Sequence, residues 1–289
     1  MKLLKKLACA AAVAMSMGAA QAAPVLNDWV FNPTGGGYES GQVINEYLDV
    51  NGNAFINLTS TGETSFSFTE HAVFNISQAD SNGILFPIAY PGGNITAVFE
   101  ATGTGNFSGA FEFTGGTIRM YQNPTNGQYG GTNGIYGANL GNLIASFDVL
   151  AGGGGLVDAS GSPTTNGQVS VFARADAGSL AEGYFFRDGG TDLSEEAVLA
   201  FAFTNANTVG DPTSRLVDEV ACEYAGFTGA GCNGAAYANA PGDYFFLSTN
   251  GQFKLNETGG EVPEPGSLAL FGIAMLGAGL AARRRAGKA

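Results

Sequence analysis

The stretch "TSFSFTEHAVFNIS", residues 64–77, decides the fold prediction for this chain. Phe66 and Phe68 alternate with polar residues, and Phe74 and Ile76 repeat the pattern a few residues later. Alternation with a period of two indicates a β-strand that buries one face and exposes the other. Similar short alternating runs occur at residues 95–99, 111–120, 143–149, 169–171, 199–203 and 253–255. The sequence therefore predicts an all-β fold.

Segments rich in Gly and Asn separate these runs. The tripeptide TNG occurs at 125–127, 132–134, 165–167 and 249–251, and Asn-Gly adopts positive φ at little steric cost. We therefore expect turns at all four sites. The 45 glycines disfavour helices, and residues 211–225 are the best helix candidate. Together these features predict an antiparallel β-sandwich with Gly/Asn-rich loops.

The N-terminus has the features of a secretory signal peptide. Lys2, Lys5 and Lys6 precede an apolar run that ends near Ala20, and an A-x-A site ends at Ala22. We predict a signal peptide at residues 1–22 and therefore an exported protein. A β-rich extracytoplasmic domain would then span 23–261, with a separate C-terminal segment at 262–289.

The predicted domain is strongly acidic. Most of the 12 basic residues lie in the two end segments, which leaves five in the domain against nearly all of the 25 acidic residues. Its formal charge is about −20, which repels nucleic acid and attracts cations. Nucleic acid is therefore excluded as a partner. Solubility alone is the other explanation for such a charge.

Two cysteines remain once the signal peptide is removed. Cys222 and Cys232 flank the segment "EYAGFTGAG". In an oxidising compartment, two cysteines around a short Gly-containing loop predict one local disulfide.

No catalytic motif is present in the sequence. There is no G-x-S-x-G, no Walker A and no H-E-x-x-H, and His71 is the only histidine. We therefore expect a protein that is not an enzyme and needs no cofactor. Tyrosines 121, 129 and 136 lie among turn residues, where they could stack on sugar rings or pack within the loops.

The segment "RDGGTDLSEE", residues 187–196, is the best candidate for a metal site. Asp188, Asp192 and Glu195 surround a Gly-Gly turn, and carboxylate oxygens are the ligands that calcium prefers. The spacing lacks the alternation of an EF-hand loop. A solvated polar turn is the alternative.

The C-terminal segment "VPEPGSLALFGIAMLGAGLAARRR", residues 262–285, combines three features. Pro263, Glu264 and Pro265 precede 15 mostly apolar residues, and Arg283, Arg284 and Arg285 follow them. As a helix the apolar run is about 22 Å long, which predicts a single short transmembrane helix. The arginines place its end in the cytoplasm and the domain outside.

This segment resembles the PEP-CTERM sorting signal. The resemblance implies that exosortase, a membrane-embedded transpeptidase of Gram-negative bacteria, is a partner. It also implies a transient tether in the inner membrane, followed by transfer to the cell surface or the exopolysaccharide matrix.

A second resemblance concerns the domain itself. Residues 133–194, together with "YFFLSTNGQFKL" at 244–255, look like the flocculation-associated PEP-CTERM proteins. This resemblance implies a non-catalytic matrix protein that contributes to biofilm or floc formation. The alternative is a secreted module that binds or degrades polysaccharide through an unrecognised carboxylate site.

Overall fold

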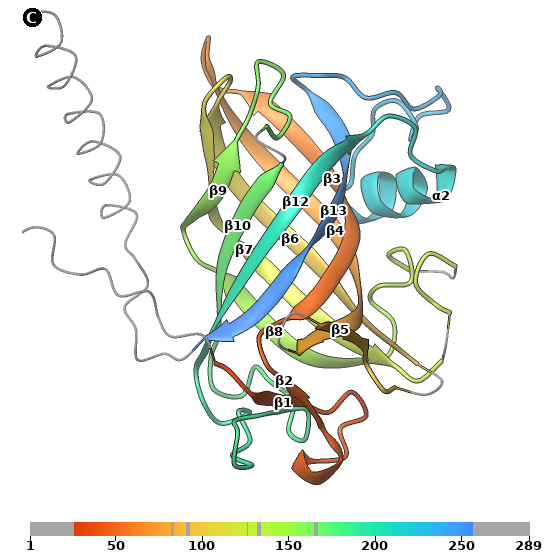
Figure 1. Cartoon of the computed structure of the whole chain (residues 1–289). Helices are drawn as coiled ribbons and strands as arrows, with labels where there is room; N and C mark the ends of the chain where they lie inside the picture. The colour runs from red at the N-terminus through yellow and green to blue at the C-terminus, as the bar shows by residue number, and fades with distance from the viewer. Residues whose placement is uncertain are drawn as a thin grey trace, which may run out of the picture. The chain divides into compact units, whose positions relative to one another are not determined.

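Long antiparallel strands make up most of the described chain (Figure 1). The computed structural model describes residues 26–81, 84–90, 93–125, 127–131, 134–164 and 167–256. The predicted signal peptide, the Pro-Glu-Pro motif, the short transmembrane helix and the arginine cluster lie outside these residues. Within them, no helix has the length and apolar character needed to cross a membrane.

Eight strands form one sheet that closes on itself. They are β3 (Leu48–Ser60), β4 (Ser65–Ser81), β6 (Asn94–Asn106), β7 (Ala110–Asn123), β8 (Asn142–Val149), β10 (Gln168–Ala175), β12 (Val198–Val209) and β13 (Tyr244–Asn256). Their order is β12-β13-β3-β4-β6-β7-β8-β10, and β10 pairs back onto β12. Two short strands are added to it: β5 (Ile84–Pro87) beside β4, and β9 (Gly152–Leu156) beside β7 and β10.

The predicted all-β, antiparallel character is confirmed, with one difference in how the layers connect. Opposite walls pack their inner faces across one core, as in a sandwich. However, β10 pairs with β12 along its whole length, from Gln168 opposite Asn205 to Ala175 opposite Val198. Hydrogen bonds therefore join the two walls on both sides. Closure satisfies the N–H and C=O groups that an open sheet would leave unpaired at its edges.

A three-stranded sheet lies at one end of the closed sheet (Figure 1). It contains β1 (Trp29–Phe31), β2 (Gln42–Ile44) and β11 (Phe185–Phe186), and the short helix η1 (Tyr38–Ser40) lies between β1 and β2. The rings of Trp29 and Phe185 stack with centroids 6.2 Å apart, and both side chains are fully buried. They belong to the same apolar core as the closed sheet, so this small sheet packs onto its interior.

In the interior, large aromatic rings on one strand lie opposite glycines on the neighbouring strand. Phe68 of β4 lies opposite Gly103 of β6. A Cβ at Gly103 would lie 2.3 Å from the Phe68 ring and 2.3 Å from the Glu112 carbonyl oxygen. The "TGTGN" run of β6 is therefore glycine-rich because the ring of a neighbouring strand fills the space that a side chain would need.

A helix covers the outer face of the sheet. It consists of α2 (Ser214–Leu216) and its π-helical continuation η2 (Val217–Tyr224), within the predicted range of 211–225. Its residues Leu216 and Val220 form a second buried cluster with Phe55 of β3 and Phe246 of β13. The predicted disulfide is present: Cys222 and Cys232 are joined, with Cα atoms 5.5 Å apart.

The turn prediction is wrong at 249–251. Thr249, Asn250 and Gly251 lie in the middle of β13, paired on both sides. A Cβ at Gly251 would lie 2.4 Å from the carbonyl oxygen of Phe203, so this glycine serves the close approach of β12. By contrast, Gly127 and Gly167 have φ of 70° and 65°, as the turn prediction requires.

Candidate functional site

A polar groove of about 400 Å³ runs over the outer face of β12, β13, β3 and β4. Its lining residues are Tyr47, Asp49, Asn51, Gln78, Leu85, Phe203, Asn205, Asn250, Gly251 and Gln252. Six of these are aligned by the strand register into two cross-strand rows. One row is Asn205, Asn250 and Asn51, and the other is Phe203, Gln252 and Asp49. The two-residue period places both rows on the same outer face, opposite the apolar core.

Hydrogen bonds within the groove orient its amides. Asn250 Nδ2 donates to Asn51 Oδ1, and Asn51 Nδ2 donates to Asp49 Oδ2 at 2.9 Å. Each side-chain amide carries two N–H donors and an oxygen with two lone pairs, so these residues keep further capacity for hydrogen bonds. The groove therefore presents donors and acceptors side by side, at the spacing of neighbouring strands.

Aromatic groups accompany the amides. Phe203 lines the groove from β12, and Tyr47 lines it just before β3. Burial, together with the negative charges of Asp80, Asp49 and Glu46, raises the pKa of the Tyr47 phenol, so it remains a neutral hydroxyl donor. Amides and hydroxyls beside aromatic rings can bind a polyhydroxylated chain, because sugars offer both hydroxyl groups and apolar ring faces.

The groove is not apparent from the sequence, because Asn and Gly are typical of turns. The usable signal was Asn at every second position within strand-like runs. "NGN" at 51–53 and "NAN" at 205–207 both place two asparagines on one face of a strand. The pairing of β13 with β12 and β3 then places Asn250 between Asn205 and Asn51.

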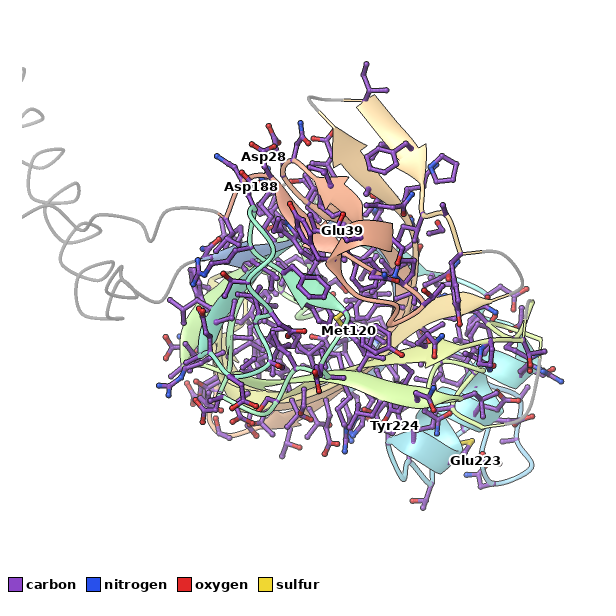
Figure 2. All side chains as sticks on the ribbon, turned by 90° about the horizontal axis from the view of Figure 1, so that it is seen from below. Asp28, Glu39, Met120, Asp188, Glu223 and Tyr224 are labelled. Atoms are coloured by element: carbon purple, nitrogen blue, oxygen red, sulfur yellow. A yellow bond between two sulfur atoms is a disulfide. The ribbon has the colours of Figure 1, made fainter. Side chains whose placement is uncertain are left out.

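The predicted calcium ligands do not come together. In the described part of the chain, no three His, Cys, Asp or Glu side chains form a group that could hold a metal ion. Asp188 and Glu195 are exposed, and Figure 2 shows Asp188 at the protein surface. Asp192 instead holds the loop, because its two oxygens accept hydrogen bonds from the backbone N–H groups of Gly183 and Ser194, each at 2.8 Å. The geometry favours the polar turn over the calcium site.

This loop gives a test with an internal control. Asp192→Ala removes two charge-assisted hydrogen bonds and should lower the free energy of unfolding by about 2–3 kcal/mol, or the Tm by about 4–10 °C. Asp188→Ala removes an exposed carboxylate and should change the free energy of unfolding by less than about 0.5 kcal/mol. Thermal unfolding of both variants, with and without calcium, checks this. Equal destabilisation, or a calcium-dependent Tm that both variants lose, would contradict the polar-turn assignment.

The only histidine packs beneath the outer helix. The His71 ring lies edge-on to Tyr224, with centroids 4.8 Å apart, and its Nε2 is 4.0 Å from Glu100 Oε1. Figure 2 shows Tyr224 on the helix outside the sheet. Burial lowers the pKa of His71, opposed by the charge of Glu100. The geometry is that of a packed, neutral histidine.

Two of the loop tyrosines also pack instead of facing solvent. Tyr129 OH donates to the Val73 carbonyl at 3.2 Å, and the Tyr129 and Tyr136 rings meet edge-to-face at 5.4 Å. Both join the outer apolar cluster under the helix. They are therefore not available for stacking on sugars.

A known sorting signal lies at the C-terminus. Residues 261–285 match the family model of the PEP-CTERM protein-sorting motif. This chain carries a PEP-CTERM sorting motif. The match includes the predicted Pro263–Pro265 core and the arginines at 283–285.

The motif establishes the route and leaves the role of the β-domain open. A PEP-CTERM motif indicates a surface protein that exosortase processes, exported through a membrane-anchored intermediate. No curated protein and no solved structure matches the chain. The resemblance of residues 133–194 to flocculation-associated proteins therefore stays a prediction.

Proposed function

We propose that this chain is a non-catalytic surface protein that binds polysaccharide of the extracellular matrix through the amide-lined groove. In this role it contributes to biofilm or floc formation. The PEP-CTERM motif supplies the route to the surface, and the groove supplies the binding site. The two cross-strand rows are the observation that carries the proposal, because they align four amides and an aromatic ring on one exposed face.

The preferred ligand is a neutral, hydroxyl-rich glycan. Among the described residues, Asp49 is the only charged side chain that lines the groove, so most of the hydrogen-bonding groups that the groove offers are neutral. The acidic surface of the domain disfavours direct contact with an acidic polysaccharide, which would need divalent cations between the two. Such a single site binds weakly, but many copies along a matrix polymer gain strength through multivalency.

The same lining favours binding over hydrolysis. Most glycosidases use a pair of carboxyl groups on either side of the scissile bond. In the groove, Asp49 has no second carboxylate to complete such a pair, and its Oδ2 already accepts a hydrogen bond from Asn51. This supports a binding module over the polysaccharide-degrading alternative.

The test uses the exported protein and exopolysaccharide from the same cells. The double variant Asn51→Ala/Asn250→Ala removes the two central amides and should weaken binding at least tenfold, at about 0.5–1.5 kcal/mol for each lost hydrogen bond. Isothermal titration, or affinity electrophoresis in the polysaccharide, gives the dissociation constant.

The control is Asn106→Ala, which removes an exposed asparagine from β6 and should leave binding unchanged. A chelator should also leave it unchanged, because the proposed contact is direct. Unaltered binding by the double variant would reject the groove. Release of reducing ends from the polysaccharide by the pure protein would reject the non-catalytic role.

A further inference from the structure

Two neighbouring, partly open cavities of about 40 and 60 Å³ lie within the closed sheet. Glu70, Val169, Thr204 and Thr249 line both, so these four residues lie between them. The other lining residues are almost all apolar. In Figure 2, Met120, which lines the larger cavity, points into the interior. Each cavity exceeds the roughly 10–15 Å³ that one water molecule needs.

Glu70 occupies a position where the strand pattern demands an apolar residue. It lies in β4 between Phe68 and Ala72, which both face the core, so the two-residue period directs Glu70 inward as well. Glu70 is partly accessible, and it lines both cavities. Burial raises its pKa to about 8. No other titratable side chain lines either cavity.

The polar groups between the cavities lack partners within the described residues. The buried Thr249 Oγ1 has no hydrogen-bond partner among the described residues. The Glu70 side chain is partly accessible, and it makes no hydrogen bond to the described residues. Buried polar groups in folded proteins are nearly always hydrogen-bonded, so the Glu70 carboxyl and the Thr249 hydroxyl, which line the same two cavities, can bond to a molecule that enters them. An apolar residue at position 70 would avoid the cost of burial altogether.

We propose that this interior is a binding site for a small molecule with an apolar body and one protonated amine. Its ammonium group pairs with the Glu70 carboxylate and donates to the Thr249 hydroxyl, and its hydrocarbon part fills the apolar space. This site is separate from the outer groove, so it does not depend on the glycan proposal.

Three observations favour an amine over a neutral ligand. An ammonium has three N–H donors, and the carboxylate and the two threonine hydroxyls that line both cavities offer acceptors. A cation stabilises the ionised carboxylate, which burial otherwise disfavours. The domain carries a formal charge of about −20, which raises the local concentration of small cations. The cavity volumes limit the body to a few carbon atoms.

The experiment titrates the processed protein recovered from the cell surface with n-butylamine and with 1-butanol, which has the same length and no charge. Butylamine should bind at one site and at least tenfold more tightly than butanol. Because Glu70 must be ionised to pair, the affinity for butylamine should rise about 50-fold from pH 6 to pH 8.

Two variants locate the site. Glu70→Gln keeps the shape and removes the charge, so binding should fall at least tenfold and lose its pH dependence. Thr249→Val should weaken binding less, by about three- to tenfold. Glu112→Gln removes an exposed carboxylate from β7 and is the matched control, expected to bind like the wild type. Far-UV circular dichroism confirms that each variant is folded.

Three results would overturn the proposal. They are no saturable binding of butylamine, equal binding by wild type and Glu70→Gln, and equal affinity for butylamine and butanol. The last result would show that the space accepts apolar molecules without using the carboxylate.

Discussion

Glu70→Gln should make the folded protein more stable, and increasingly so as the pH rises from 5 to 7. Burial raises the pKa of Glu70 from 4.5 to about 8, so between these values the folded state retains a proton that the unfolded state releases. The free energy of unfolding of the wild type therefore falls by about 1.4 kcal/mol per pH unit in this window. Gln has no such titration, so the difference between the proteins should grow by about 2–3 kcal/mol from pH 5 to pH 7.

Urea unfolding of both proteins at pH 5, 6 and 7 measures this directly. Other titrating groups act equally in the two proteins and cancel in the difference. Glu112→Gln should have the same free energy of unfolding as the wild type at all three pH values, because that carboxylate is exposed. Parallel pH profiles for wild type and Glu70→Gln would show that Glu70 is ionised in the folded state.

The strands were predictable because the signal is local. The alternation of Phe66 and Phe68 with Ser67 shows that the segment has one buried face, whatever it pairs with. Closure was not predictable from the same signal. The pairing of β10 with β12 joins residues 168–175 to 198–205, and an inward-facing strand has the same periodicity in an open or a closed sheet.

The candidate sites also differ in whether they depend on residues close in the sequence or on the pairing of distant strands. The loop around Asp192 and the disulfide of Cys222 depend on neighbours close in sequence, and both were visible as motifs. The groove depends on Asn51 meeting Asn250, which is 199 residues away, and local turn chemistry suggested a different role for Asn250. Glu70 carried no sequence signal of an interior site, because its inward direction follows from the core positions of Phe68 and Ala72 in the structure.

Changing Pro263 and Pro265 to Ala should abolish release of the protein from the inner membrane. Both residues belong to the matched sorting motif, and we predict that the apolar run and arginines behind it hold the chain in the bilayer until it is processed. Fractionation should therefore show the variant in the inner membrane and the wild type at the cell surface. Replacing Pro124, which lies in the β-domain, with Ala provides a control that should be sorted normally.

The central claim, delivery of this β-domain to the surface by its C-terminal motif, is tested most directly by the intact mass of the protein recovered from the cell surface. We predict a mass that ends near Pro265 and lacks Arg283, Arg284 and Arg285. A surface protein that retains these three arginines would contradict the account.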